Sequence, residues 1–279
     1  MLVNIHLPKN AGTTLNAVLA RNFGDRFMVL NPWQEAAEQP KCEPMDGAFF
    51  LPPAPKAVCL AALRRAKKDG MDAVSGHWLY PFDPLTAEQN DLQLMTFVRH
   101  PVARLLSLYH YERKWSTRRP DIYGEKHCSQ KPFEEYLAVK ATNTGCLDNW
   151  QCSQLAGVPS GSAAIDKLRG FFFVGLVEQW NRSMILLART IPATGIAKDF
   201  DIRYVRLHGA SAAQRSGVDL SMAFQRELIE RNSEDMALYE YARNRIRSGW
   251  LASSGRHRML ARLLLDRAAG HLGRRLGAM

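Results

Sequence analysis

Two short segments of the sequence combine cationic, hydroxyl and small residues in a way that suits phosphate groups. Residues 8–14 read Pro-Lys-Asn-Ala-Gly-Thr-Thr, and a second segment opens with Arg99 and reaches Ser107 eight residues later. Lysine and arginine neutralise phosphate, glycine lets the backbone approach it closely, and hydroxyl and backbone N–H groups donate to its oxygens. Together the two segments predict a binding site for a phosphorylated ligand.

The first segment is not a Walker A loop, although it has similar ingredients. Walker A places its lysine after the last glycine, whereas here Lys9 precedes Gly12 by three positions. A nucleotide triphosphatase also needs an acidic residue at a strand end to hold magnesium, and the clearest strand of this chain stops at Arg99 instead. These departures predict a site that neutralises phosphate with side chains and needs no metal. A kinase-like P-loop enzyme that uses ATP is the rival reading among enzymes.

The first segment lies at a predicted junction between a strand and a helix. The apolar run over residues 2–7 predicts a buried strand, and apolar residues then recur at helical spacing from Leu15 to Phe23. We expect Thr13 or Thr14 to cap this helix. Such a turn aims backbone N–H groups at an anion. An ordinary turn between a strand and a helix would give the same pattern.

The second segment lies at a similar junction. A strand is expected over residues 92–98, and Pro101 then stands at a favourable first position of a helix. Arg99 would remain at the strand end while Ser107 lies on the helix, so that both could reach one phosphate. Arg104 lies on the same helical face as Ser107, where an exposed or paired role fits it as well as a ligand contact.

Strands and helices alternate through most of the chain, which predicts an α/β protein with a parallel sheet in one domain. Further strands are expected over residues 72–77 and 171–174, and further helices near 57–69, 132–140, 148–156, 162–169, 178–190 and 221–246. Residues 31–56 hold six prolines and predict a long surface excursion. The tail over 251–279 has the pattern of a basic amphipathic helix, expected to dock on the domain, with weak contact to a membrane surface as the alternative.

The composition describes a globular chain with a basic surplus. Of 279 residues, 37 are lysine or arginine and 27 are aspartate or glutamate, which gives a formal net charge of +10. This surplus predicts an anionic partner, and a non-catalytic binder of nucleic acid or another polyanion is the rival reading outside enzymes. Against nucleic acid, no RNA-binding or DNA-binding module signature is present in the sequence.

The sequence contains no recognisable transmembrane segment or secretory signal peptide. Its apolar runs are too short to span a bilayer, and no signal peptide is visible, so a cytoplasmic location is expected. The five cysteines form no C-x-x-C pair, and an odd number argues against a complete set of disulfides. All five are expected to be free thiols.

The two phosphate-binding segments resemble the 5′-phosphosulfate loop and the 3′-phosphate motif of the sulfotransferases that use 3′-phosphoadenosine 5′-phosphosulfate (PAPS). The flanking pattern is most similar to the carbohydrate branch that includes heparan sulfate 2-O-sulfotransferases and bacterial members. Residues 149–157 resemble its N-x-Q-x-x-x-L-x-G segment, 173–178 its F-V-G-x-x-E strand end, and 232–242 its N-x-x-D-x-x-L-Y-x-x-A helix. The resemblance implies a P-loop-NTPase-like domain over residues 1–250, three-layered, with helices flanking a mainly parallel sheet.

The resemblance also implies a role for individual residues. Lys9 would stabilise the departing nucleotide, and His77 would take the proton from an acceptor hydroxyl, expected on a saccharide. Without the resemblance a packed core histidine fits His77 as well, and some branches use glutamate as the base. The side chain of His6, at a strand end, is expected to be satisfied by the backbone, and a position facing the cleft is the alternative. The donor PAPS would contact Lys9, Asn10, Ala11, Gly12, Thr13, Thr14, Arg99, Ser107 and Arg215.

Overall fold

The fold is built on a sheet of five parallel strands. A computed structural model of the chain describes residues 1–31, 54–77, 79, 91–116, 131–144, 147–202 and 218–252. The strands are β1 (Leu2–Ile5), β2 (Phe27–Val29), β3 (Ala73–Gly76), β4 (Gln93–Val98) and β5 (Phe173–Leu176), and they lie in the order β2-β3-β1-β4-β5. β1 is therefore the central strand, with Leu2 opposite Ala73 on one side and opposite Gln93 on the other.

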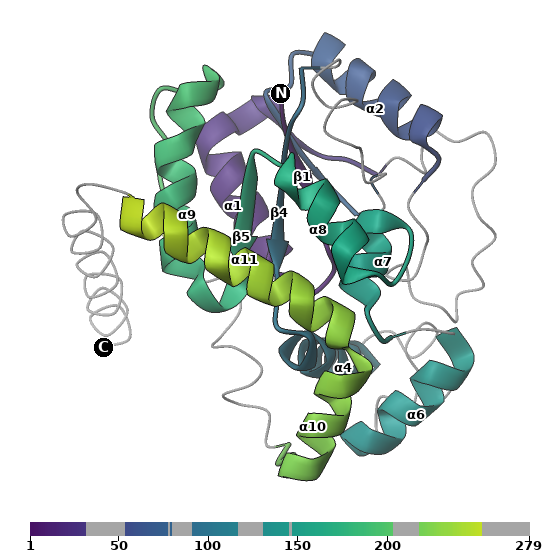
Figure 1. The fold of residues 1–279 in the computed structure, drawn as a ribbon. Helices are drawn as coiled ribbons and strands as arrows, with labels where there is room; N and C mark the ends of the chain where they lie inside the picture. Colours follow the sequence, from purple (N-terminus) through teal and green to yellow (C-terminus); the bar gives the residue numbers. More distant parts are fainter. Residues whose placement is uncertain are drawn as a thin grey trace, which may run out of the picture.

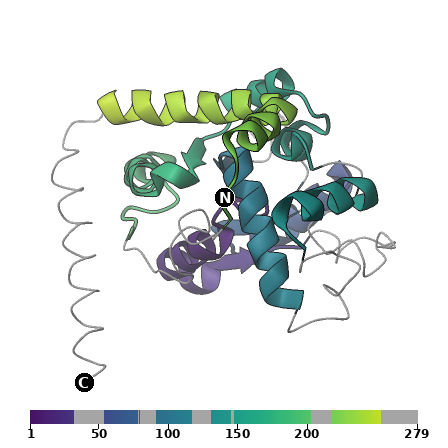
Figure 2. The same ribbon diagram turned by 90° about the horizontal axis from the view of Figure 1, so that it is seen from below.

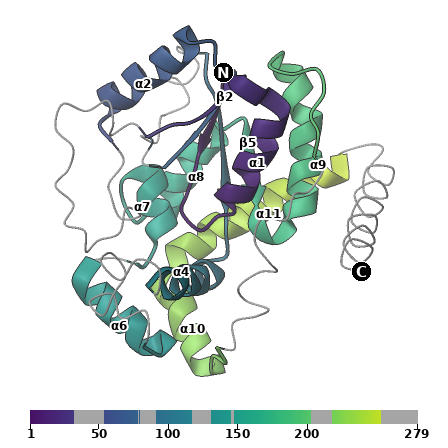
Figure 3. The same ribbon diagram turned by 180° about the vertical axis from the view of Figure 1, so that it is seen from behind.

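Helices cover both faces of this sheet. Figures 1 and 3 show α1 (Gly12–Phe23) on one face, with α8 (Gly161–Arg169) and α11 (Ser233–Ala252) across the other. Because both faces are covered, β1, β3 and β5 are buried along their whole length, as their nearly continuous apolar sequences require. The α/β fold with a central parallel sheet flanked by helices, expected from the sequence, is confirmed.

The remaining described helices connect and surround these elements. They are α2 (Lys56–Lys68), α4 (Pro101–Ser116), α6 (Phe133–Thr144), α7 (Trp150–Ala156), α9 (Trp180–Thr190) and α10 (Met222–Arg231), with short 3-10 turns at Gly24–Arg26, Val177–Gln179 and Ile191–Thr194. Among the described helices, none is both long enough and apolar enough to cross a membrane.

The apolar interior is divided into two clusters of buried side chains. The larger cluster surrounds the sheet and includes Leu2, Val74 and Leu187. The smaller one joins α4, α6 and α10 beside the sheet, where these helices lie together in Figure 2, and it is centred on Tyr109 and Tyr136. Helix α4 is therefore held firmly at the end of β4, which fixes the position of the second predicted phosphate-binding segment.

The structure differs from the sequence-based expectations at three elements: one strand was missed, and the bounds of one helix and one strand were wrong. The strand β2 was not expected, because its three residues are too few to show a pattern. The single helix expected over 221–246 is two helices, α10 and α11, because the side chain of Asn232 donates back to the Leu228 carbonyl at 2.8 Å where the chain changes direction. The last strand lies over Phe173–Leu176 rather than 171–174.

Several expectations fall on parts of the chain that the structure does not describe. Most of the proline-rich excursion, residues 32–53, lies outside the described residues, as does the basic tail beyond Ala252. Arg215 and the cysteines at 42, 128 and 146 lie outside them too. The other two cysteines, Cys59 and Cys152, are buried free thiols, as expected.

Candidate active site at the carboxyl edge of the sheet

Polar residues follow four of the strands at the same edge of the sheet. His6 and Lys9 come after β1, His77 after β3, Arg99 after β4 and Glu178 after β5. The carboxyl ends of parallel strands meet at one edge, and ligands of open α/β sheets bind there. The sheet topology thus gathers residues that are up to 172 positions apart in the sequence.

The loop between β1 and α1 has an unusual backbone. Lys9 and Ala11 both adopt left-handed conformations, with φ angles of 70° and 62°. Such turns of the backbone form concave surfaces of N–H groups that bind anions. Ala11 is also the N-cap of α1 and makes no side-chain cap, so the cap expected from Thr13 or Thr14 is wrong. Thr13 is exposed and Thr14 half-buried on the first turn of the helix.

The side chain of Lys9 reaches from this loop to α4. Its Nζ atom lies 3.6 Å from the centre of the Tyr111 ring, which attracts the ammonium group through its negative face. Burial lowers the pKa of Lys9 to about 7, and the positive charge of Arg99 contributes to this shift. A substantial fraction of Lys9 is therefore neutral at physiological pH when no anion is bound.

Arg99 lies beside Lys9 at the end of β4. It is only 7% exposed, and its Nη1 donates to the backbone carbonyl of Lys9 at 2.7 Å. Its Nε lies 3.9 Å from Oε1 of Glu178 and makes no hydrogen bond within the described part of the chain. Burial lowers the pKa of Arg99, against the attraction of Glu178. Two cations are thus held close together in a poorly solvated place.

Gln151, on α7, ties the loop to the end of β4. Its Oε1 accepts from Nδ2 of Asn10 at 2.8 Å and from the backbone N–H of Arg99 at 3.0 Å, while its Nε2 donates to the Arg99 carbonyl at 2.8 Å. Nδ2 of Asn10 also donates to the Phe97 carbonyl at 2.7 Å. One buried amide therefore fixes both phosphate-binding segments relative to each other.

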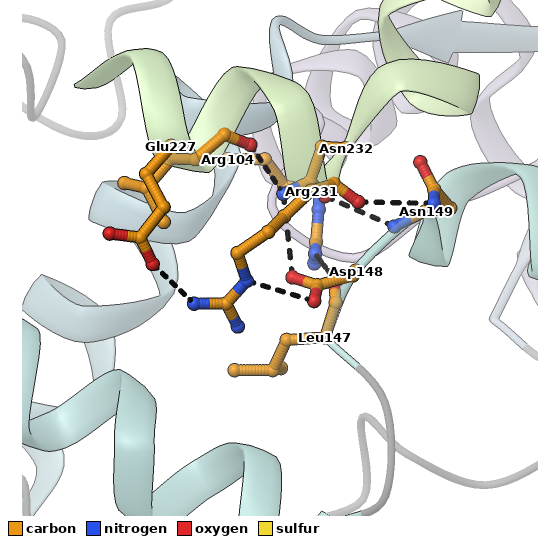
Figure 4. A network of polar contacts seen from close by, with 8 residues as sticks. Arg104, Leu147, Asp148, Asn149, Glu227, Arg231 and Asn232 are labelled. Carbon is orange, nitrogen blue, oxygen red and sulfur yellow. Dashed lines mark hydrogen bonds and ion pairs between the residues drawn. The ribbon is translucent and has the colours of Figure 1, made fainter. Parts of the chain in front are cut away.

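A second layer of hydrogen bonds holds α7 itself in place. Asp235 accepts from the backbone N–H groups of Gln151 and Cys152 at 3.1 and 2.9 Å, and from Nε2 of Gln151 at 3.3 Å. Beside it, Asn149 and Asn232 join the start of α7 to the junction of α10 and α11 (Figure 4). These residues come from the motif segments at 149–157 and 232–242, for which the sequence alone indicates no contact.

Arg104 has a structural position rather than a ligand-binding one. Its Nη2 donates to the Leu147 carbonyl at 3.1 Å (Figure 4), and its guanidinium lies 4.8 Å from the centre of the Trp150 ring. Ser107 is half-buried and lies one helical turn before Tyr111, so both face the side of α4 where Lys9 lies. The Arg104 side chain is therefore part of the core, and it is only 1% exposed.

His77 is fixed at the end of β3 by a hydrogen bond to the backbone. Its Nδ1 lies 2.9 Å from the carbonyl oxygen of His6. A carbonyl only accepts, so Nδ1 carries the proton and the lone pair of the neutral ring is on Nε2. Burial lowers the pKa of His77, and Lys9 lowers it further. The ring is therefore a neutral base at physiological pH.

The residues predicted for the site are thus partly brought together. Lys9, Asn10 and Arg99 are joined by the contacts above, and His77 is linked to the same loop through His6, which follows the central strand β1. The predictions missed Gln151 and Glu178 as supports of Arg99, although both stand in segments with a family pattern. Within the described ranges, no group of three or more His, Cys, Asp or Glu side chains could hold a metal ion.

Comparison with known proteins identifies the class to which this fold and site belong. The model of the sulfotransferase family matches residues 1–242, so the chain belongs to that family. An uncharacterised protein from Archaeoglobus fulgidus is 26% identical over 262 residues, covering 86% of this chain and 94% of the relative.

The chain is also similar to a sulfotransferase of known structure from Alicyclobacillus acidocaldarius. The matched region covers 86% of this chain and 93% of the other, with 16% sequence identity and a TM-score of 0.42. A likeness at this level carries no argument about the site.

Proposed function

We propose that the protein transfers a sulfuryl group from PAPS to a hydroxyl group of an acceptor, expected to be a saccharide. Membership of the sulfotransferase family supports the type of reaction. The observation that carries the choice of donor is the buried pair of cations, Lys9 and Arg99, at the carboxyl edge of the sheet. Burial lowers the pKa of both groups, and Arg99 lowers that of Lys9 further, so a ligand with several negative charges would stabilise the pair in this poorly solvated place.

The residues present fit a nucleotide that carries phosphate at both ends and a sulfate. Arg99 offers Nε, a buried donor with no hydrogen bond among the described residues, and Lys9 offers its ammonium group. The left-handed loop and the first turn of α1 add backbone N–H groups, with Thr14 beside them. In the proposal, Arg99 and Ser107 hold the 3′-phosphate while Lys9 and the loop hold the 5′-phosphosulfate.

The donor supplies a sulfuryl group on a phosphate oxygen, a good leaving group once its charge is stabilised. The Lys9 ammonium group donates a hydrogen bond to that departing oxygen, and its positive charge provides the stabilisation that a metal would otherwise give. His77 accepts the proton of the acceptor hydroxyl at Nε2, because Nδ1 is already engaged with the His6 carbonyl. The acceptor oxygen forms the new bond to sulfur as the bond between sulfur and the phosphate oxygen breaks.

A reducing compartment, expected to be the cytoplasm, is part of the proposal. The buried free thiol of Cys152 supports it, because disulfides are rare where thiols are kept reduced.

Thermal unfolding with two nucleotides tests the proposal. Adenosine 3′,5′-bisphosphate, the product left after transfer, should raise the melting temperature without magnesium, because a ligand at a hundred times its Kd adds about 2.7 kcal/mol of stability. Mg-ATP should add little. The Lys9→Ala variant should lose most of the stabilisation. Lys67→Ala is the matched control and should keep it, since Lys67 pairs with Asp91 on the surface at 3.0 Å.

Stabilisation by Mg-ATP alone would contradict the proposal and favour a kinase-like reaction. Equal stabilisation by any polyanion, with a steep dependence on salt, would favour a non-catalytic polyanion binder instead.

A further inference from the structure

His6 occupies the space between the candidate base and the candidate donor loop. It follows β1, and its backbone joins it to the neighbouring strand and loop, since its N–H donates to the Gly76 carbonyl at 2.9 Å and its carbonyl accepts from His77 at 2.9 Å. These contacts involve only the backbone of His6, so the expectation that backbone groups satisfy its side chain stays a prediction. The imidazole ring makes contacts of another kind.

One face of the His6 ring lies on the ring of His77. The two ring centres are 3.9 Å apart and the ring planes differ by 28°, so the rings are stacked. His77 is thereby held twice by the same residue, through the His6 carbonyl at Nδ1 and through the His6 ring at its face. Its ring cannot rotate about the bond to the backbone without losing both contacts.

The His6 ring also lies directly against Gly12. A Cβ atom built on Gly12 would overlap Nε2 and Cε1 of His6, so any other residue at this position would displace the ring. Gly12 is the first residue of α1, at the end of the loop that carries Lys9. The absence of a side chain at Gly12 therefore makes room for a ring that reaches from the loop to His77.

We infer that His6 is a positioning residue whose imidazole, wedged between Gly12 and His77, sets the orientation of the base relative to the donor loop. The inference rests on the proposed function, because it gives His77 and the loop their roles. It also provides a second reason why position 12 must be glycine, besides the close approach of a phosphate to the backbone. The ring acts by its shape, since the contact to Nδ1 of His77 comes from the backbone of His6 and survives substitution.

The charges around the two rings agree with a role in packing. Burial lowers the pKa of His6 well below its ordinary value, and both His77 and Lys9 lower it further. His6 is therefore neutral at physiological pH. A phenyl ring of similar size should then replace its packing, whereas a methyl group should not.

Four variants test the wedge: His6→Phe, His6→Ala, Gly12→Ala and the double variant His6→Ala with Gly12→Ala. His6→Ala should lower kcat at least tenfold while the Kd for adenosine 3′,5′-bisphosphate stays within threefold. His6→Phe should keep kcat within threefold of the wild-type value. Gly12→Ala should weaken nucleotide binding at least tenfold, because the new methyl group and the His6 ring cannot share the space. Adding His6→Ala to Gly12→Ala should restore most of that affinity.

A titration of the His77 ring by NMR gives a readout that needs neither donor nor acceptor. In His6→Ala, water reaches the face of the His77 ring that the His6 ring otherwise covers. The pKa of His77 should then rise towards its ordinary value, since burial is the main cause of its depression. In His6→Phe the pKa should stay low. Circular dichroism confirms that each variant is folded.

Three results would overturn the inference: a wild-type kcat in His6→Ala, a kcat as low in His6→Phe as in His6→Ala, or no recovery of affinity in the double variant. Failure of the proposed function looks different, because the wild-type protein itself would then not bind adenosine 3′,5′-bisphosphate.

Discussion

Arg99 follows β4 and His77 follows β3, on opposite sides of the central strand, and the two residues are held in different ways. Around Arg99, the backbone and the neighbouring loop are fixed by a buried network of hydrogen bonds that runs through Gln151 to Asp235. Around Lys9 and His77, the side chains rest on aromatic rings, those of Tyr111 and His6. The Arg99 backbone is thus fixed by hydrogen bonds, whereas the side chains of Lys9 and His77 also pack against rings, and His77 adds one hydrogen bond to the His6 carbonyl.

The difference matches what each side has to do in the proposed reaction. A fully satisfied hydrogen-bonded network is rigid, and here it sets the distance between the two phosphate-binding segments. Ring contacts fix direction while leaving the ammonium and imidazole groups able to change charge. Burial lowers the pKa of Lys9 to about 7, so Lys9 can change its charge near physiological pH. Burial also lowers the pKa of His77, so its ring is neutral and can accept a proton. The substitutions below separate binding from proton transfer on this basis.

The largest effect is expected from His77→Ala. Removal of a general base lowers kcat by about a hundredfold to ten-thousandfold, whereas the Kd for adenosine 3′,5′-bisphosphate should be unchanged because His77 does not belong to the Arg99 network. Steady-state kinetics with PAPS and calorimetric titration of the nucleotide measure the two quantities. A loss of nucleotide affinity as large as the loss of kcat would show that the two sides are not separate.

The next largest effect is expected on stability, from Asp235→Ala. This carboxylate accepts three hydrogen bonds from α7, and its loss leaves buried N–H groups unsatisfied, at a cost of about 3 kcal/mol in the free energy of unfolding. Urea denaturation measures the change. Asp166→Ala is the matched control, since Asp166 is paired with Arg169 on the surface at 3.0 Å, and it should change stability by less than about 0.5 kcal/mol. Equal effects of the two substitutions would contradict the rigid role of the network.

A smaller effect is expected from Tyr111→Leu. Loss of the ring removes an attraction of about 1 kcal/mol from the Lys9 ammonium. The charged form of Lys9 becomes less stable relative to the neutral form, so the pKa of Lys9 falls below about 7 by somewhat less than one unit. The alkaline limb of kcat/KM should move to lower pH by the same amount. Tyr111→Phe keeps the ring and should leave the limb in place. A shift of the same size in Tyr111→Phe would assign the effect to the hydroxyl group instead.

The sequence predicts the parts of this comparison that depend on local pattern. The strands before Lys9, His77 and Arg99 are visible as apolar runs, and parallel strands must end at one edge, so the meeting of these residues follows from the fold class. The family pattern also marks the segments that contain Gln151 and Asp235. Their contacts were not predictable, because the two residues are 84 positions apart and meet only through the packing of α7 on α11.

The ring contacts were harder still to predict. The overlap of the His6 ring with a side chain at Gly12 depends on a left-handed loop formed by Lys9 and Ala11, and such a conformation in residues other than glycine leaves no signal in a single sequence. The contact between Lys9 and Tyr111 depends on the rotation of α4 about its axis. The position of Arg104 was unpredictable for the same reason, because the sequence does not distinguish an arginine in the core from one that contacts a ligand.

The pH dependence of nucleotide binding tests the central claim, that the Lys9 ammonium group binds the nucleotide. Adenosine 3′,5′-bisphosphate should raise the pKa of Lys9 from about 7, so the bound state takes up a proton and affinity falls as the pH rises above 7. Calorimetric titrations between about pH 7 and 9 avoid the ionisation of the phosphates, whose second pKa is near 6. The wild-type Kd should rise up to about tenfold per pH unit, and the dependence should vanish in Lys9→Ala. A Kd that is constant across this range in the wild-type protein would contradict the account.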